Sequence, residues 1–351
     1  MFPSELGFAM PPEWSGHMGT LMEWPIKEAL WPEPFEEVLE AFANAAKSIA
    51  QFEPVIMIAR PELAGQAHRL CGDGIKILEM LHDDSWMRDN GPTLVINSRG
   101  ELAGINWRFN AWGGKYPFNY DDMVAFKVLN YLEIPCFDAP LVMEGGSIHV
   151  DGEGTLLTTE QCLLNANRNP HMNKEQIEDM LKKYLGAKKI IWLKSGLYGD
   201  DTDGHIDNVA CFAAPGRVIV QTSSDKNNPN YERSAENLEI LKNCTDAEGR
   251  LLEIIEVEQP GEELYDGAYL TLSYINFYFV NGGIILPVFG GKHSETDSNA
   301  KNVLQRVFPD RRVVAVDGMP IARGGGNVHC ITQQMPRGVP AGTFKEGRMS
   351  Y

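Results

Sequence analysis

The chain has 351 residues, and its 31 Lys or Arg against 48 Asp or Glu give a formal net charge of −17 at pH 7. With 43% hydrophobic and 23% charged residues, the composition is typical of a folded globular chain and excludes a disordered one. The acidic balance argues against a nucleic-acid surface and favours a cationic substrate, while a merely solvated acidic surface would give the same charge.

Neither a secretory signal nor a membrane segment is predicted. Met1–Met10 lacks a basic region followed by a long apolar run, and apolar stretches such as Ile284–Val288 are far shorter than the roughly 20 residues that a membrane helix needs. We therefore expect a cytoplasmic protein with no membrane partner, whose six cysteines stay reduced. No two of them form a C-x-x-C pair, so each is expected to be a small buried apolar side chain or a nucleophile.

Apolar periodicity predicts a series of helices and strands. In chain order, the patterns predict a helix at Phe35–Ile49, a strand at Val55–Ala59, a helix near Leu63–Leu70, strands at Ile75–Leu78 and Thr93–Ile96, helices at Val124–Leu132 and between Asn173 and Gly186, a strand at Val218–Thr222, a helix at Glu232–Asn243, strands at Phe277–Val280 and Ile284–Val288, a helix at Asp297–Phe308 and a strand at Val313–Val316. The first helix follows Pro34 and has two glutamates near its start. Asn173 and Gln176 form a capping box, and Gly186 ends that helix.

Five short polar segments recur along the chain, and a predicted helix precedes each of them. Anchored at Asp89, Glu144, His205, Ile275 and Gly326, they are separated by 55, 61, 70 and 51 residues. The second and fifth align directly, as Gly-Gly-Ser-Ile-His against Gly-Gly-Asn-Val-His. This spacing predicts a closed ring of strand-rich units in one α/β domain, with the polar segments meeting at its axis. A plain α/β domain with glycine turns is the alternative.

Cysteine and histidine within these segments indicate a nucleophilic site. Cys330 follows a run of three glycines by four residues, and glycines let the backbone approach a ligand closely. His205 stands among aspartates at positions 200, 201, 203 and 207. Such carboxylates favour the imidazolium, which would in turn lower the pKa of a nearby thiol. Cys and His from separate units, with carboxylates from others, fit covalent catalysis by a Cys–His pair.

Each of these residues also has a purely structural interpretation. His205 could be a core or strand-end histidine, and Glu144 could simply occupy a turn. Asp89 could pair with Arg88, Trp86 could serve packing alone, and the loop at 200–203 could be solvated. The individual residues do not decide between these interpretations and a catalytic site.

A metal site is a further alternative. The spacings His205-x-Asp207 and His149-x-Asp151 resemble those of metal ligands. The H-x-E with P-C-x-x-C pattern of zinc deaminases and the H-E-x-x-H motif are absent from the sequence, as are P-loop and dinucleotide fingerprints. We therefore expect neither a catalytic metal nor an organic cofactor.

Longer motifs around the same residues resemble those of the agmatine deiminase family. They are Trp-Met-Arg-Asp-Asn-Gly-Pro at 86–92, Asn-Ala-Trp-Gly-Gly at 110–114, Glu-Gly-Gly-Ser-Ile-His-Val-Asp-Gly-Glu-Gly at 144–154, Asn-Ala-Asn-Arg-Asn-Pro at 165–170, Gly-His-Ile-Asp-Asn at 204–208 and Gly-Gly-Gly-Asn-Val-His-Cys-Ile-Thr at 324–332. The resemblance runs from about Pro12 to Pro336. It implies the pentein fold, a five-module pseudosymmetric α/β propeller, and hydrolysis of agmatine to N-carbamoylputrescine and ammonia without a cofactor.

The same resemblance gives each candidate residue an expected role. Cys330 is expected to be the nucleophile and His205 the general acid and base, while Glu144 pairs with the substrate guanidinium beside the histidine. The other expected substrate contacts are the carboxylates of Asp89 and Asp207, Asp201 on the loop before the histidine, Trp86 along the alkyl chain, and Gly325.

The family resemblance also implies a homo-oligomer, a dimer or tetramer, that acts on a small cation in the arginine-to-putrescine polyamine route. Residues 1–351 are expected to form one catalytic domain of about five ββαβ-like modules, with Met1–Pro11 and Gly338–Tyr351 at its periphery. Between Gln259 and Tyr274 the chain is shorter than in many members, which carry an Arg-containing loop there, so loop closure and fine selectivity stay open.

Two other functions remain as alternatives, a related enzyme acting on arginine or peptidyl-arginine and a non-catalytic polyamine-binding relative. The loop Gly199–Gly204 contains three aspartates and no basic residue. Such a loop favours the ammonium of agmatine over a substrate that bears a carboxylate. The combination of Cys330 with His205 argues against a relative that only binds polyamines.

Overall fold

Five sheets repeat one strand pattern. The computed structural model describes residues 1–27, 31 and 34–342. Within this part of the chain, each of the five contains an antiparallel pair extended by a parallel strand. The triplets are β18 (Thr332–Pro336), β1 (His17–Glu23) and β2 (Val55–Ala59); β4 (Thr93–Ile96), β5 (Glu101–Arg108) and β6 (Cys136–Val142); β7 (His149–Val150), β8 (Thr155–Thr159) and β9 (Lys189–Leu193); β10 (Ala210–Ala214), β11 (Arg217–Thr222) and β12 (Glu253–Glu258); β15 (Tyr278–Val280), β16 (Gly283–Val288) and β17 (Arg312–Asp317).

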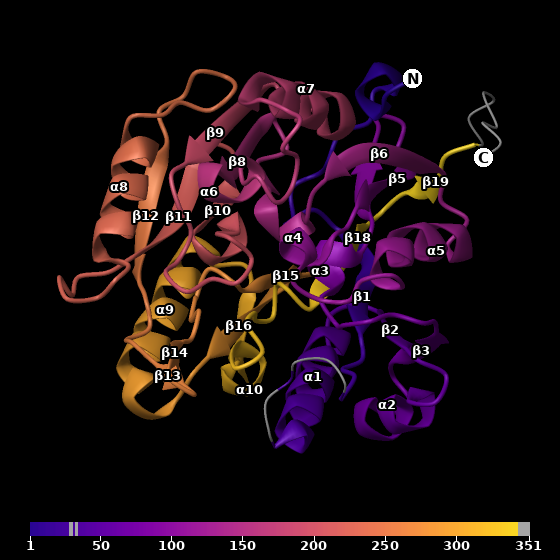
Figure 1. The fold of residues 1–351 in the computed structure, drawn as a ribbon, viewed down its shortest axis with the longest axis horizontal. Helices are drawn as coiled ribbons and strands as arrows, with labels where there is room; N and C mark the ends of the chain where they lie inside the picture. The colour runs from indigo at the N-terminus through magenta and orange to yellow at the C-terminus, as the bar shows by residue number, and fades with distance from the viewer. Residues whose placement is uncertain (28–30, 32–33, 343–351) are drawn as a thin grey trace.

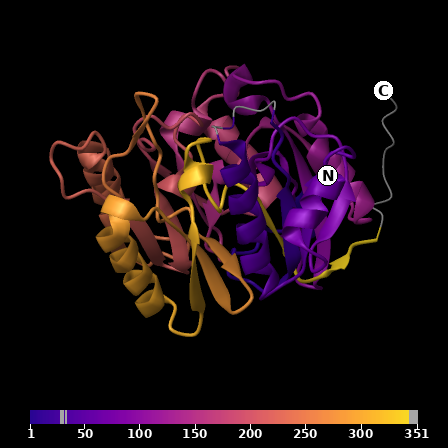
Figure 2. The ribbon, with the colours of Figure 1, turned by 90° about the horizontal axis from the view of Figure 1, so that it is seen from below.

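A long helix connects the second and third strands of each triplet. These helices are α1 (Phe35–Ala50), α5 (Val124–Tyr131), α7 (Lys174–Leu185), α8 (Tyr231–Lys242) and α9 (Ser294–Val307). In Figure 1 they lie around the outside of the ribbon, whereas the short α3 (Met87–Asn90), α4 (Ala111–Gly114) and β15 lie near its middle. Figure 2, seen from below, shows α1 in front of its strands. The helices therefore cover the outer side of the sheets.

The six predicted helices are confirmed, with ends that shift by at most a few residues. The sixth is α2 (Ala64–Cys71), beside β3 (Lys76–Glu79). At the start of α7 the Gln176 N–H donates to Asn173 Oδ1 at 2.9 Å, and the Asn173 N–H donates to Gln176 Oε1 at 2.8 Å. Gly186 ends this helix with φ +71°, in the left-handed region that favours glycine. The capping box thus forms as the sequence predicts.

The seven predicted strands are also confirmed, but within the described residues eight strands of more than two residues were not predicted. The unpredicted ones are β1, β5, β6, β8, β9, β10, β12 and β18. β8 reads Thr-Leu-Leu-Thr-Thr and β18 reads Thr-Gln-Gln-Met-Pro, yet every residue of both strands is buried. Their polar side chains find partners inside the fold, as when Gln333 Nε2 donates to the Pro92 carbonyl at 2.9 Å. Such strands show no alternation of apolar and polar residues to detect.

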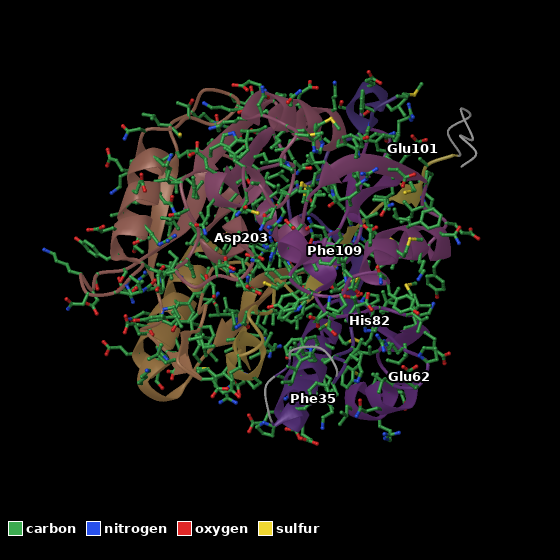
Figure 3. The ribbon with its side chains drawn as sticks, viewed as in Figure 1. Phe35, Glu62, His82, Glu101, Phe109 and Asp203 are labelled. Atoms are coloured by element: carbon green, nitrogen blue, oxygen red, sulfur yellow. The ribbon has the colours of Figure 1, made fainter. Side chains whose placement is uncertain are left out.

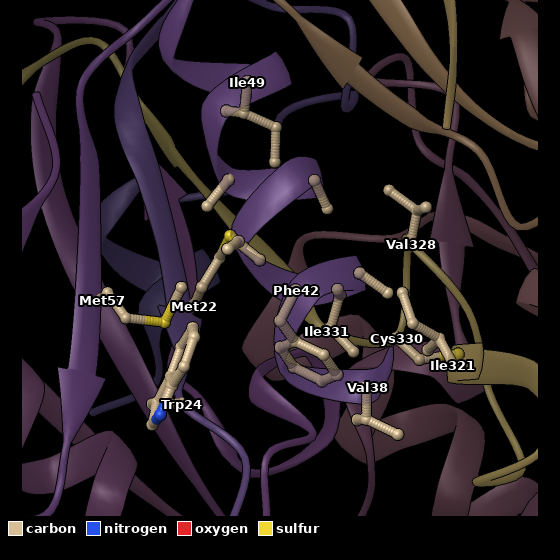
Figure 4. Close-up of a cluster of buried hydrophobic side chains, with 14 of the residues drawn as sticks. Met22, Trp24, Val38, Phe42, Ile49, Met57, Ile321, Val328, Cys330 and Ile331 are labelled. Carbon is tan, nitrogen blue, oxygen red and sulfur yellow. The ribbon is translucent and has the colours of Figure 1, made fainter. Parts of the chain in front are cut away.

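The N-terminal segment contributes to the core. Phe8 and Met10 are buried, and Ala9 forms a β-bridge with Ile96, so the expectation that Met1–Pro11 is peripheral is wrong. Near the other end, β19 (Val339–Pro340) pairs with β5, while residues 343–351 lie outside the described part of the chain. The largest cluster packs α1 against the segment around Cys330, as Figure 4 shows for Phe42 and Ile331.

All six cysteines are free, and none pairs in a disulfide. Four of them are buried, and Cys136 and Cys244 are partly exposed. No helix among the described residues has the length and apolar character required to span a membrane.

Candidate active site

The five polar segments occupy equivalent places in the five triplets. Each lies directly before the first strand of its own triplet: Asp89 before β4, Glu144 before β7, His205 before β10, Ile275 before β15 and Cys330 before β18. Glu144 and His205 each immediately precede a short 3-10 turn. The predicted repeat therefore corresponds to a structural repeat, and it brings side chains distant in sequence to one place.

A glycine keeps open the space in which these segments meet. The Gly146 N–H donates to Asp89 Oδ1 at 3.0 Å. A Cβ atom at this position would lie 2.6 Å from His205 Nδ1, 2.9 Å from Asp89 Oδ1 and 3.0 Å from Asp207 Oδ2. Two carboxylates and an imidazole thus face one small volume, which any side chain at position 146 would fill.

His205 is fully buried between two carboxylates. Its Nδ1 lies 3.7 Å from Asp89 Oδ1, and its Nε2 lies 3.6 Å from Glu144 Oε2. Within the described residues neither ring nitrogen has a hydrogen-bond partner. Burial alone would lower the pKa of His205, but its neighbours, Asp89 foremost, raise it well above the ordinary value. The imidazolium that the sequence predicts is therefore favoured, with its N–H groups available to a ligand.

Arg168 anchors Glu144, a contact that sequence reasoning missed although the residue lies in a quoted motif. Its Nε donates to Glu144 Oε1 at 2.7 Å, and both side chains are fully buried. Burial would raise the pKa of Glu144, but the guanidinium holds it below the ordinary value. Arg168 also donates to Asp203 Oδ2 at 2.7 Å and to the Thr202 carbonyl at 2.8 Å. Figure 3 places Asp203 near the centre of the view, whereas Glu62 and Glu101 lie toward the rim.

A buried chain of hydrogen bonds positions Asp207. Nδ1 of His329 lies 2.9 Å from Asp207 Oδ2, and Nε2 lies 2.9 Å from Oε1 of Glu13. Arg88 reaches the same glutamate at 3.5 Å, so the interpretation that pairs it with Asp89 is wrong. Both ring nitrogens of His329 are engaged, whereas Asp207 Oδ1 is buried without a hydrogen-bond partner among the described residues. Glu13 lies outside every motif, and no sequence signal pointed to it.

The thiol of Cys330 is buried at the edge of the same space. Asn276 Nδ2 donates to Sγ at 3.1 Å, and Sγ lies 3.4 Å from Asp207 Oδ2. Burial, together with the carboxylates of Asp207 and Asp89, raises the pKa of Cys330 well above its ordinary value. The expected lowering of this pKa by an imidazolium is therefore wrong for the free site, because burial and the two nearby carboxylates dominate.

An open pocket of about 490 Å³ borders Cys330. Trp86 lines it and stacks on Trp31, with ring centroids 5.0 Å apart and planes 23° apart. Trp86 thus offers a flat apolar wall as well as a packing contact, and no sequence pattern pointed to Trp31. The other lining residues are Asp84, Asp89, Trp112, Tyr116, Asp201, Thr202 and Gly324–Gly326, which include Gly325.

Two carboxylates of this pocket differ in their surroundings. Asp201 has a half-exposed side chain, accepts from the Tyr116 hydroxyl at 2.5 Å and lies 3.6 Å from Lys115 Nζ. A cation from another segment thus reaches the acidic loop, which sequence reasoning did not foresee. Asp84, which the sequence analysis missed, accepts from a backbone N–H at 2.8 Å and from Trp86 Nε1 at 3.0 Å. Burial raises the pKa of Asp84 to about 6.

One group of potential metal ligands occurs within the described residues. Glu144, Cys162 and His205 are buried, and their ligand atoms lie within 4.8 Å of one another. The two predicted His-x-Asp pairs form no such group in the described part of the chain. His149 Nδ1 instead accepts from the Phe212 N–H at 3.2 Å.

Comparisons with known proteins agree with one another. Residues 9–336 match the family model described as Porphyromonas-type peptidyl-arginine deiminase. The chain is 44% identical to the agmatine deiminase of Ectopseudomonas mendocina over 359 residues, covering 95% of this chain and 97% of that protein. It is similar to the solved agmatine deiminase of Enterococcus faecalis with a TM-score of 0.93 and 38% identity, covering 96% and 98% of the two chains. A dimethylarginine hydrolase structure, DDAH from Pseudomonas aeruginosa, shares the fold at a TM-score of 0.51 and 14% identity, covering 91% of this chain and all of that one.

Proposed function

This chain belongs to the Porphyromonas-type peptidyl-arginine deiminase family, and on that premise we propose that it acts as an agmatine deiminase. The enzyme hydrolyses a C–N bond of a linear amidine, converting agmatine to N-carbamoylputrescine and ammonia. One observation carries this proposal most directly. Asp89, Asp207 and His205 face a single volume kept open by Gly146, beside the Cys330 thiol and an acidic pocket.

The carboxylates bind the planar guanidinium. Its five N–H donors match acceptor oxygens in one plane. Asp207 Oδ1 is buried with no partner in the described structure, and Glu144 Oε2 has only the ionic contact with His205 Nε2 at 3.6 Å and a weak contact with the Cys162 thiol at 3.9 Å. A bound cation supplies the donors that these oxygens lack, so the site is built for a positive ligand.

Substrate binding then activates the nucleophile. In the free site, Asp207 and Asp89 disfavour the Cys330 thiolate. A guanidinium between them neutralises their charge and adds a positive one next to the sulfur, which lowers the thiol pKa. The thiol therefore ionises when substrate is present, and the buried nucleophile stays protonated when it is absent.

The reaction proceeds in two displacements on one carbon. The Cys330 thiolate forms a bond to the guanidinium carbon, the C–N bond to one terminal nitrogen breaks, and His205 gives its proton to the leaving ammonia. Water then attacks the amidino-cysteine, His205 takes up a proton from it, and the C–S bond breaks to return the thiolate. Glu144, fixed by Arg168, stabilises the imidazolium before ammonia leaves and again after His205 has taken up the proton from water.

The outer pocket favours an amine over an amino-acid end. Asp84 and Asp201 supply negative charge there, and the stacked rings of Trp31 and Trp86 provide an apolar wall for a four-carbon chain. Gly325 lets the chain pass close to the backbone, since it has φ +105° and no neighbour within 4 Å of a Cβ position. Arginine has an α-carboxylate, which would meet two like charges, and peptidyl-arginine lacks the terminal ammonium that these carboxylates attract, so both are disfavoured.

The five equivalent triplets also support the finer proposals on fold and assembly. We take them as the modules of a five-module propeller that forms one catalytic domain, with the site at its axis. Four apolar side chains around α5, namely Tyr120, Met123, Phe126 and Tyr131, are each 40–44% exposed. They support the proposed homo-oligomer, which size-exclusion chromatography with light scattering tests. The cytoplasm and the arginine-to-putrescine polyamine route are the proposed setting.

An ammonia-release assay with agmatine, arginine and a peptidyl-arginine substrate tests the proposed function. Agmatine should be turned over with at least a roughly hundredfold higher kcat/KM than either alternative, which corresponds to about 3 kcal/mol. Preference for arginine or peptidyl-arginine would overturn the substrate assignment. The absence of ammonia release from all three, with agmatine binding retained, would point to the polyamine-binding alternative.

A further inference from the structure

We propose that Glu144, Cys162 and His205 form a binding site for a thiophilic divalent cation such as Zn²⁺, and that its occupation reversibly stops turnover. This site is distinct from the Cys330 thiol, and the deiminase reaction does not require it. Three observations support this site: the chemistry of the three side chains, the distances between their ligand atoms, and the lack of a hydrogen-bond partner on either ring nitrogen of His205 among the described residues.

The three donors have the spacing of metal ligands. Nε2 of His205 lies 3.6 Å from Oε2 of Glu144, Sγ of Cys162 lies 3.9 Å from that oxygen, and all three ligand atoms lie within 4.8 Å of one another. Zinc bonds of about 2.0–2.3 Å at tetrahedral angles place ligand atoms about 3.3–3.8 Å apart. The His205–Glu144 and Cys162–Glu144 distances must shorten by a few tenths of an ångström for all three ligand atoms to bond one zinc ion. The widest of the three distances must shorten somewhat more.

The donors are also available. His205 is fully buried, yet both of its ring nitrogens lack a hydrogen-bond partner among the described residues. Arg168 occupies only the opposite oxygen of Glu144, Oε1, and thereby orients Oε2 toward the histidine and the thiol. The contact of Cys162 with that carboxylate, at 3.9 Å, is long enough for a cation to replace the weak S–H donor. Imidazole, thiolate and carboxylate are together a typical zinc donor set.

The surrounding charge favours a cation. Asp89 lies 3.7 Å from the other nitrogen of His205, and its carboxylate is buried. The Arg168 guanidinium opposes this, but it is already paired with both Glu144 and Asp203. Carboxylates near the site therefore outnumber the positively charged side chains, and the local charge favours a divalent metal ion.

Binding changes the protonation of the site. The Cys162 S–H bond breaks and its proton passes to water, while sulfur donates its electron pair to the metal. His205 releases its Nε2 proton to water and coordinates the metal through the lone pair of that nitrogen, which can then no longer carry the proton for departing ammonia. Nothing is oxidised or reduced, and a chelator restores the free site.

The test uses the full chain with Cys330→Ser, which removes the competing nucleophilic thiol and turnover. After treatment with chelator and its removal, the variant is titrated with Zn²⁺ by calorimetry and with Co²⁺ by absorption. We expect one equivalent of metal, together with a thiolate-to-cobalt charge-transfer band in the near ultraviolet. Adding Cys162→Ser should abolish the band and weaken Zn²⁺ binding roughly tenfold or more.

A matched control is Cys71→Ser in the same background, because Cys71 is a buried cysteine of α2 in the apolar cluster on α1. It should keep both the band and the affinity. Thermal melts show whether each variant is folded, and Cys162→Ala gives a second probe if Ser perturbs packing. No metal bound by the Cys330→Ser protein, or unchanged binding after loss of Cys162, would overturn the proposal. Neither result bears on agmatine turnover, which is measured separately in metal-free wild type.

Discussion

Replacing Asp84 by Asn removes one negative charge from the outer pocket while nearly keeping the shape of the side chain. Asp84 accepts from two neutral donors and is partly buried, so solvent screens an incoming ammonium less there than beside a half-exposed carboxylate. Two opposite charges about 4 Å apart attract by about 4 kcal/mol at an effective dielectric of about 20. Desolvation offsets part of this, and we expect about 2–3 kcal/mol, or a roughly 30- to 150-fold loss of kcat/KM for agmatine.

Asp201→Asn is the matched comparison, since it removes the same charge from the same pocket. Its side chain is 51% exposed and already lies near Lys115, and exposed pairs contribute about 0–1 kcal/mol. The expected loss is therefore at most roughly fivefold. The sequence-based expectation assigned the substrate ammonium to Asp201, whereas the structure favours Asp84 as the stronger contact.

The assay follows ammonia release from agmatine and from pentylguanidine, in which a methyl group replaces the ammonium. Asp84→Asn should impair turnover of agmatine and leave that of pentylguanidine nearly unchanged, because the guanidinium contacts stay in place. Equal losses with the two substrates would show that the substitution distorts the site rather than removing an attraction. A larger loss in Asp201→Asn than in Asp84→Asn would refute the argument from burial.

The other predictions concern the reacting groups. Cys330→Ser should abolish turnover while retaining agmatine binding, and mass spectrometry of wild type should find the covalent adduct on Cys330; an adduct on another cysteine refutes the assignment. His205→Asn should lower kcat by roughly 10²–10⁴-fold, and a loss below tenfold would transfer the role to another group. Gly146→Ala should lower kcat/KM far more than it lowers Tm, because its Cβ would lie 2.6 Å from His205 Nδ1; a parallel loss of both would indicate misfolding. The pKa values of Asp84 and Asp89 are both about 6, and only the ionised forms attract a cation. Agmatine kcat/KM should therefore fall as pH drops through 6, and part of that fall should vanish in Asp84→Asn.

The sequence predicted the helices and the positions of the polar segments better than it predicted the strands. Helices with one apolar face, such as α1 and α7, show a clear period and caps. Strands such as β8 and β18 are buried on both sides with polar side chains, so their burial depends on neighbours that no local pattern reveals. The confirmed helices and the five anchors were nevertheless enough to predict a repeated unit.

Sequence patterns identified as candidates the residues that lie in repeated segments, and they missed neighbouring side chains that lie outside them. Cys330, His205, Glu144, Asp89 and Asp207 lie together as expected, apart from the thiol pKa. Glu13, Trp31 and Asp84 reach the site from outside the motifs, and only long-range packing brings them there. The sign of the Cys330 pKa shift depends on how deeply the sulfur is buried and on which charges lie nearest it, and spacing in the sequence contains neither.

The pairing of β18 with β1 makes the active site depend on two segments that are synthesised far apart in time. β18 follows Cys330 by two residues and aligns antiparallel with β1, so that Gln334 lies opposite Thr20. During synthesis the first strand emerges early and waits for its partner until more than three hundred further residues have been made. A nascent chain therefore contains the carboxylates and the histidine before it contains the thiol. Cys330 reaches its place beside them only when β18 pairs with β1. For the same reason, cleavage or truncation that prevents β1 from pairing with β18 would abolish activity while most of the sheets remain intact.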